Sequence, residues 1–289
     1  MMNIIIYCEG TTGSHDRDIL EKILDNLPSI PTIEPLGGKR GAGGYISIHK
    51  NKVQNVDSYI FFRDNDFDYE ENRKCDETNE EKLHIIEKKN PDGSLAGKWL
   101  ISYRTTIENY LINPKHFFEY LILNKKCTEL NLNSEHEVKA LFDKVAKEIS
   151  AYQAIRHTLG KLRKNLDLGT TWRKGSGDLP EQLDLEFCKI KALEKIREKR
   201  QEADEWSDEV FYKTLEPFLQ RFNTSEFYIK MEYLIWFQGK DFTKHLRTIL
   251  CQSEKFILEY YKYAKSQINF IDFPDLRQLR DEVENRINS

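Results

Sequence analysis

Cysteine is scarce in this sequence, and the cysteines that are present follow no metal-binding pattern. Among 289 residues there are five, at Cys8, Cys75, Cys127, Cys188 and Cys251. No two of them form a C-x-x-C pair. An odd, scattered set of this kind argues against a disulfide framework and against a structural zinc site, and it favours a reduced compartment.

Long hydrophobic runs are also missing. No apolar stretch approaches the roughly 18 residues that a membrane-spanning helix needs. The N-terminal MMNIIIYCEG has neither a basic start nor a small-residue cleavage site. We therefore expect a cytoplasmic protein with no membrane partner.

Neither sign of charge dominates the composition. There are 44 Lys and Arg against 48 Asp and Glu, so the formal net charge is −4. This balance excludes a globally basic nucleic-acid binder, although it leaves room for a local basic groove. The length permits one large domain or two smaller ones, with enough residues to bury a core.

The first third of the chain alternates strand and helix patterns. Strands are predicted at residues 3–8, 32–36 and 57–63, with a helix from Ser14 to Leu27 and a second helix at 45–53. Two further short strands, 84–88 and 99–103, flank an Asn-Pro-Asp-Gly turn at 90–93. This order predicts an α/β fold with a mostly parallel sheet flanked by helices.

The pattern changes from Pro114 onward, where apolar residues recur at helical spacing and strand-like runs almost vanish. We therefore predict a sheet domain at residues 1–113 and a large, mainly helical part at 114–289. Residues 168–179 are predicted to form a loop within the helical part. The segment around 228–250 is expected to pack back on the sheet domain.

Acidic residues follow two of the predicted strands. Glu9 comes after the first strand, and Asp64, Asp66 and Asp68 come after the third. Because side chains beyond the carboxyl ends of parallel strands converge on one crevice, these carboxylates are expected to meet. An all-oxygen ligand set suits Mg²⁺ or Mn²⁺, and it points to metal-assisted phosphoryl chemistry.

The acidic stretch admits other interpretations. A solvated turn after a strand remains open for Asp64 and its neighbours. A calcium loop is rejected, since Tyr69 and Cys75 stand where that motif needs Gly and Glu. A haloacid-type phosphatase would use the D-x-D pattern but would leave Glu9 without a role.

In combination, these residues resemble a known domain. Glu9-Gly10 after the first strand and Asp64-Asn65-Asp66-Phe67-Asp68 after the third are similar to the Toprim domain of topoisomerases, primases and overcoming-lysogenization-defect nucleases. The segment RTTIENYL at 104–111, followed by Pro114, and the later Gly239-Lys240-Asp241 resemble a Toprim-like family. Members of that family are paired with ABC-type ATPases in prokaryotic anti-phage systems.

The resemblance implies an effector nuclease with a Toprim-like sheet. In that family the glutamate is a metal ligand or general acid/base and the D-x-D aspartates hold divalent metal, roles that carry over to Glu9, Asp64 and Asp66. Asp68 would be a third aspartate ligand, at a position where the commonest pattern has a glycine or another non-acidic residue. Lys240 would supply positive charge to the transition state.

Several residues are candidates for support. Gly10 and His15 lie beside the predicted active turn, and Glu108 follows a predicted strand. For His15 a capping or surface role is the alternative, for Glu108 a helix-capping acid, and for Lys240 an ordinary surface lysine.

A basic segment with interleaved rings is the candidate nucleic-acid groove. Between residues 156 and 174 a single acid, Asp167, stands among six cationic side chains and two rings. Such a cluster can neutralise phosphates, and a tryptophan can stack on an unpaired base; a solvated helix face is the alternative. The candidates are Arg156, Lys161, Arg163, Lys164, Trp172, Arg173 and Lys174.

The acidic residues and the resemblance together predict a Mg²⁺-dependent endonuclease, and the resemblance implies that it is the toxic effector of a defence system. The resemblance favours tRNA as substrate and an ATPase encoded nearby as partner, and a homodimer is attractive because one groove of this size is small for a folded RNA. Two rivals remain: a DNA endonuclease of the overcoming-lysogenization-defect type, and a non-catalytic Toprim-like module that docks on an ATPase.

Overall fold

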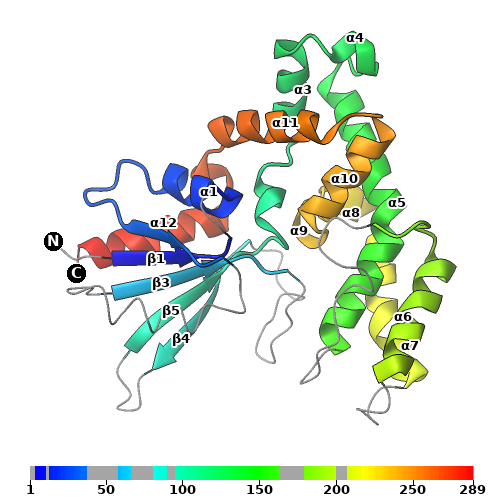
Figure 1. Ribbon diagram of the computed structural model, residues 1–289, viewed down its shortest axis with the longest axis horizontal. Coiled ribbons are helices and arrows are strands. Elements are labelled where there is room, and N and C mark those ends of the chain that lie inside the picture. Colours follow the sequence, from blue (N-terminus) through cyan, green and yellow to red (C-terminus); the bar gives the residue numbers. More distant parts are fainter. Residues whose placement is uncertain are drawn as a thin grey trace. The chain divides into compact units, whose positions relative to one another are not determined.

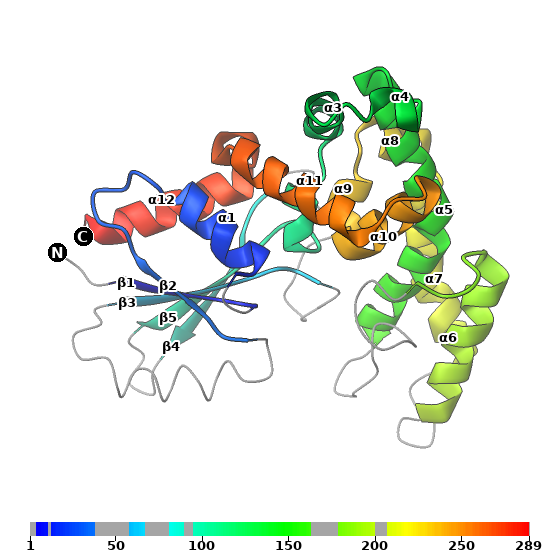
Figure 2. The same cartoon turned by 45° about the horizontal axis from the view of Figure 1, so that its top comes forward.

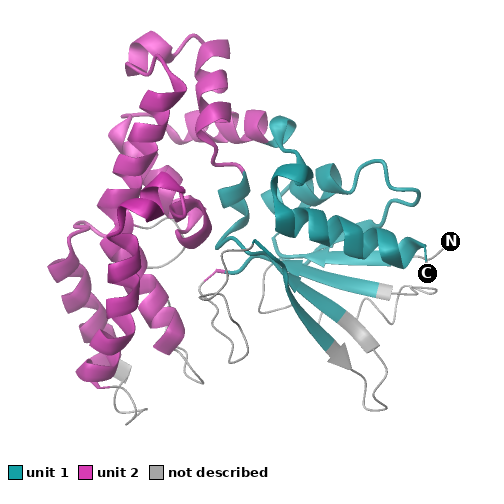
Figure 3. Cartoon of the chain, turned by 180° about the vertical axis from the view of Figure 1, so that it is seen from behind, with its two compact units in different colours: residues 1–65, 73–110, 265–289 teal, residues 66–72, 111–264 magenta. Residues whose placement is uncertain are grey.

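The computed structural model describes residues 4–10, 13–37, 58–66, 81–89, 95–162, 179–199 and 207–288. The predicted helix at 45–53, the turn at 90–93 and nearly all of the predicted loop at 168–179 lie outside these residues. The chain forms two compact units (Figure 3). Unit 1 comprises residues 1–65, 73–110 and 265–289, and unit 2 comprises residues 66–72 and 111–264.

Unit 1 is built on a five-stranded sheet with strand order β2-β1-β3-β5-β4 (Figure 1). The strands are β1 (Ile4–Cys8), β2 (Thr32–Pro35), β3 (Ser58–Arg63), β4 (His84–Lys89) and β5 (Leu95–Ile101). All neighbours pair in parallel except β4 and β5, which are antiparallel. The predicted α/β class and mostly parallel sheet are confirmed, while β5 begins and ends earlier than the predicted 99–103.

The central strands are buried on both faces. Every residue of β1 is buried, as is typical of a parallel strand covered on both sides. Successive side chains alternate between faces, so Ile5, Tyr7 and Phe61 share one face, where they pack with Leu36. The helices α1 (His15–Ile23) and α12 (Pro274–Ile287) lie together on one face of the sheet, as both views show (Figures 1 and 2).

The C-terminal helix belongs to the sheet unit. Arg280 Nη1 of α12 donates to the carbonyl oxygens of Ile23 and Asp25 at 2.6 and 2.7 Å. Glu282 accepts an ion pair from Lys98 of β5 at 2.6 Å. The single predicted boundary near residue 113 therefore differs from the observed units, which divide after residue 110 and return residues 265–289 to the sheet.

Unit 2 is helical, and its longest helix is α5 (Glu135–Leu162). Aromatic residues fill its core: Phe142 of α5 contacts Phe117 and Phe242 with ring centroids 5.5 and 5.3 Å apart. The segment around 228–250, predicted to pack back on the sheet domain, lies in this unit. The other helices of unit 2 are α3 (Pro114–Leu123), α4 (Cys127–Leu130), α6 (Leu185–Lys199), α7 (Asp208–Phe222), α8 (Ser225–Ile229), α9 (Tyr233–Trp236), α10 (Gly239–Ile249) and most of α11 (Glu254–Gln267).

Two short 3-10 helices, η2 (Ile107–Tyr110) and η4 (Phe270–Asp272), belong to unit 1. Among the residues that the structure describes, no helix is both long enough and apolar enough to cross a membrane.

Candidate metal centre

Glu9 is placed by a turn that only glycine fits well. It directly follows β1, and its N–H donates to the carbonyl of Phe62 at 3.3 Å, which extends the β1–β3 pairing. Gly10 has φ of +101°, in the left-handed region that favours glycine. A Cβ at Gly10 would lie 2.6 Å from Ser14 Oγ and 3.0 Å from Asp16 Oδ2. The turn is therefore closely packed against the start of α1.

Asp64 and Asp66 are placed by the end of β3, beside the end of β1. Cys8 of β1 is in register with Phe62 of β3, so both strands reach the same sheet edge together. The chain then turns, with Asp66 at φ of +48°. One Asp64 oxygen, Oδ2, accepts from the N–H of Ile107 at 3.3 Å.

The three carboxylates converge as predicted. Glu9, Asp64 and Asp66 each offer one ligand oxygen, and these atoms all lie within 4.8 Å of one another. All three side chains are half-buried, so the site is shielded and still reachable from solvent. Three carboxylates at such separations repel one another unless a cation lies among them, and oxygen-only ligands suit Mg²⁺ or Mn²⁺. Asp68, the fourth predicted ligand, lies outside the described residues.

The predicted support residues have distinct positions in unit 1. Gly10 forms the turn after Glu9. Glu108 is buried, 3% exposed, on η2, next to the Ile107 peptide that contacts Asp64. His15 is half-buried and begins α1. Ser14 occupies the N-cap position of α1, but its side chain makes no capping hydrogen bond.

Two charged residues near the triad were missed by sequence reasoning. Arg63 is 3% exposed and its Nη1 lies 3.4 Å from the carbonyl oxygen of Asp64. Asp16 is 8% exposed and faces the Gly10 turn. A signal for Arg63 was available, because a charge at the end of an otherwise apolar strand is uncommon without a partner.

Lys240 lies in unit 2, in the first turn of α10, and its side chain is exposed. Its neighbour Asp241 is fully buried. In the Gly-Lys-Asp sequence, the lysine side chain is therefore exposed to solvent and the aspartate side chain lies in a buried polar cluster. The role of Lys240 at a phosphate stays a prediction.

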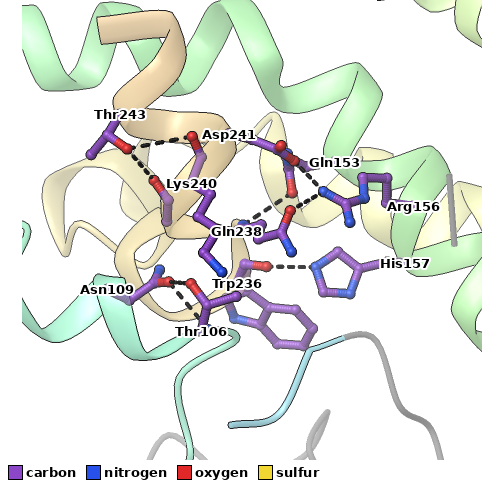
Figure 4. Close-up of polar contacts among 11 residues, drawn as sticks. Thr106, Asn109, Gln153, Arg156, His157, Trp236, Gln238, Lys240, Asp241 and Thr243 are labelled. Atoms are coloured by element: carbon purple, nitrogen blue, oxygen red, sulfur yellow. Dashed lines mark hydrogen bonds and ion pairs between the residues drawn. The ribbon is translucent and has the colours of Figure 1, made fainter. Parts of the chain in front are cut away.

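Arg156 does not belong to a surface groove. It is 3% exposed and forms a buried ion pair with Asp241, and it also donates to Gln238 (Figure 4). Gln153 donates to the same Asp241 carboxylate at 2.8 Å. The end of α5 is buried on nearly all sides, and of the two cations that the structure describes there, Arg156 is buried while Lys161 is half-exposed.

The remaining basic candidates are only partly described. Lys161 is half-exposed, with Nζ 4.7 Å from the centre of the Phe218 ring. The interleaved His157 is buried and stacks on Phe218, with centroids 4.9 Å apart. The other five candidates lie outside the described residues: Arg163, Lys164, Trp172, Arg173 and Lys174.

Burial keeps His157 neutral. It lowers the pKa of the imidazole from 6.5 to about 3, and the hydrogen bond to the Trp236 carbonyl opposes this shift only in part. Nε2 lies 2.7 Å from that carbonyl oxygen, and since a carbonyl only accepts, Nε2 carries the proton. His157 is therefore a core residue.

Comparison of the sequence with models of known families and with curated proteins finds no match. The geometry of Glu9, Asp64 and Asp66 is thus the observation on which a functional interpretation depends, together with the motif resemblance.

Proposed function

We propose that this chain is a metal-dependent, Toprim-type endonuclease that acts as the toxic effector of an anti-phage defence system. The observation that carries the proposal is the convergence of Glu9, Asp64 and Asp66 within 4.8 Å at the carboxyl edge of parallel strands. This edge is where ligand sites form in open α/β sheets. The order of the acids, one after β1 and two after β3, follows the Toprim pattern.

The donor set fits Mg²⁺ or Mn²⁺. Three carboxylate oxygens from two adjacent strand ends supply hard ligands, and their half-buried setting keeps them reachable from solvent. A bound divalent ion would stabilise charge on a scissile phosphate and activate water.

The chain's own residues would bind the ion, accept a proton and orient the ligands. Asp64 and Asp66 would hold the ion, while a carboxylate oxygen of Glu9 either joins them or accepts a proton from the attacking water. Asp64 is oriented by the backbone N–H of Ile107, so one of its oxygens has a fixed direction. Gly10 keeps Glu9 against the sheet edge through its left-handed turn.

Resemblance to the AriB effector of the PARIS system supports tRNA as the substrate and an ABC-type ATPase as the partner. Lys240, and the basic residues after α5, are the proposed contacts to phosphate. A homodimer would enlarge the surface that meets a folded RNA. Nothing in the acidic triad reads a 2′-hydroxyl, and so DNA is the alternative substrate that the assay must include.

The test is a cleavage panel with the full chain. Parent, Glu9→Gln and Glu87→Gln proteins are incubated with total tRNA, ribosomal RNA and plasmid DNA, each with Mg²⁺, Mn²⁺ or EDTA and with or without the ATPase encoded nearby. Glu87 is an exposed acid on edge strand β4, so it is a matched control for the loss of one carboxylate. We expect discrete tRNA fragments that need the metal, persist in Glu87→Gln and vanish in Glu9→Gln.

Cleavage of plasmid alone would move the assignment to a DNA endonuclease. Equal cleavage by parent and Glu9→Gln would contradict the proposed centre. Absence of cleavage in every lane, including those with the ATPase, would favour the non-catalytic binding module.

A further inference from the structure

A segment far along the chain from Asp64 donates a hydrogen bond to that carboxylate. Residues 102–110 are here called the brace. They begin directly after β5 and include η2 at their end. Ser102 continues the β3–β5 pairing by donating its N–H to the carbonyl of Arg63 at 2.9 Å. Every residue from Thr105 to Tyr110 is buried, although the sequence TTIENY is mostly polar. Buried polar residues are retained where their hydrogen bonds fix a particular geometry.

The inner part of the brace is closed by the side chain of Asn109. Its Oδ1 accepts from the N–H of Thr106 at 3.2 Å and from the Thr106 hydroxyl at 2.6 Å (Figure 4). In return, the N–H of Asn109 donates to the Thr106 carbonyl at 3.0 Å. Asn109 is 1% exposed. The next peptide after Thr106 is that of Ile107, whose N–H points at Asp64.

The outer ends of the brace are held by one carboxylate from α12. Asp275 Oδ2 accepts from the N–H of Tyr103 at 2.9 Å and also from the hydroxyl of Tyr110. Asp275 is fully buried. Arg104 crosses between these ends, donating to the Asn109 carbonyl at 3.0 Å and lying 5.2 Å from the centre of the Tyr110 ring.

The brace contacts the segment after β3 at two points. The N–H of Ile107 donates to Asp64 Oδ2 at 3.3 Å, and the amide of Asn65 donates to the carbonyl of Tyr103 at 3.4 Å. A backbone donor of this kind selects one orientation of a carboxylate. Groups that orient metal-ligating carboxylates set metal affinity without touching the metal.

We infer that Asn109 and Asp275 are positioning residues for Asp64, acting through the brace and the N–H of Ile107. The inference rests on the proposed function, because it assumes that Asp64 is a metal ligand. It adds that the metal affinity of the triad depends on the hydrogen bonds that Asp275 of the C-terminal helix accepts from the two ends of the brace.

The test measures Mn²⁺ affinity of the full-length protein by titration, with Asp64→Asn marking the triad-dependent site. Two variants loosen the brace. Asn109→Ala removes the acceptor for the N–H and hydroxyl of Thr106, and Tyr110→Phe removes only the Tyr110 hydroxyl that donates to Asp275. Each has a matched control in unit 2. Asn113→Ala removes the acceptor for the N–H of His116, 3.2 Å away, and Tyr260→Phe removes a buried hydroxyl that donates to the Leu111 carbonyl at 2.6 Å.

We expect both brace variants to raise the Kd for Mn²⁺ about tenfold, as loss of outer-sphere support typically does, while both controls stay within about twofold of the parent. Unfolding midpoints are measured in parallel, since a purely structural role would lower them without changing the Kd. Brace variants that bind Mn²⁺ like the parent, or controls that weaken it equally, would overturn the inference and leave the metal centre standing. A parent with no Asp64-dependent Mn²⁺ site would overturn the proposed function and the inference with it.

Discussion

At residue 10 the backbone requires glycine for two separate reasons. The φ angle of +101° disfavours any side chain, and a Cβ there would meet Ser14 Oγ at 2.6 Å. Gly13, three residues on, has a similar φ of +84°, but a Cβ at that position would meet no atom within 4 Å. Substitution of Gly13 therefore tests backbone strain alone, whereas substitution of Gly10 tests backbone strain together with steric overlap.

We expect Gly10→Ala to lower the free energy of unfolding by about 3 kcal/mol and Gly13→Ala by about 1 kcal/mol, the upper and lower ends of the range for a strained backbone. Because the overlap pushes on the turn after Glu9, Gly10→Ala should also weaken Mn²⁺ binding. Urea unfolding and Mn²⁺ titration measure the two effects. Equal losses in both variants would show that the contact with Ser14 yields without cost.

The buried His157 makes stability depend on pH in a definite direction. Its pKa is 6.5 when unfolded and about 3 in the folded chain, so below pH 6.5 the unfolded chain takes up a proton that the folded chain does not. Stability is therefore lost as the pH falls from 6.5 toward 3. At pH 5 the loss relative to pH 7 amounts to about 2 kcal/mol from this group alone.

Urea unfolding at pH 7 and pH 5 tests this. His157→Phe, which keeps a ring against Phe218, should reduce the difference between the two pH values by about 2 kcal/mol. The exposed His136 provides the control, because His136→Gln should retain the drop of the parent. The same pH difference in parent and His157→Phe would contradict a neutral, buried imidazole.

Between elements, Arg156 on α5 and Asp241 on α10 form a buried ion pair. Its side chains are 4% and 0% exposed. Removing one partner leaves a buried charge, and so Asp241→Ala should cost about 3–5 kcal/mol. The exposed pair of Lys191 and Glu194 gives the comparison, since Glu194→Ala should cost less than about 1 kcal/mol.

Replacing both partners separates the charge from the packing. Arg156→Met combined with Asp241→Leu should recover most of the stability lost in Asp241→Ala, because apolar groups of similar volume need no desolvation. Thermal and urea unfolding measure all three proteins. A double variant as unstable as Asp241→Ala would mean that the hydrogen bonds of Gln153 and Gln238 with this pair matter more than its charge.

The strands of unit 1 could be predicted because buried parallel strands appear as short apolar runs, as in IIIYC of β1 and SYIFFR of β3. The early start of β5 was missed because Ala96 and Gly97 carry little strand preference. The clustering of cations in the sequence also misplaced Arg156 in a surface groove, since α5 is buried nearly all round at that position.

Over the whole molecule, the return of the C-terminal helix to the sheet was beyond the reach of local patterns. The sequence of α12 shows that Leu276, Leu279 and Val283 share a helix face, but it does not show which surface that face covers. The contacts of Arg280 with Ile23, Glu282 with Lys98 and Asp275 with Tyr103 supply that information. The acidic site was predictable because parallel topology alone brings strand ends together.

The most direct test of the proposed metal centre is the affinity of the full chain for Mn²⁺, because it needs neither substrate nor partner. Titration is followed calorimetrically for parent, Glu9→Gln, Asp64→Asn, Asp66→Asn and the control Glu87→Gln. We expect a site in the parent and in Glu87→Gln that is weakened at least about tenfold, or lost, in each of the three triad variants. Equal Mn²⁺ binding by the parent and all three triad variants would contradict a metal centre at Glu9, Asp64 and Asp66.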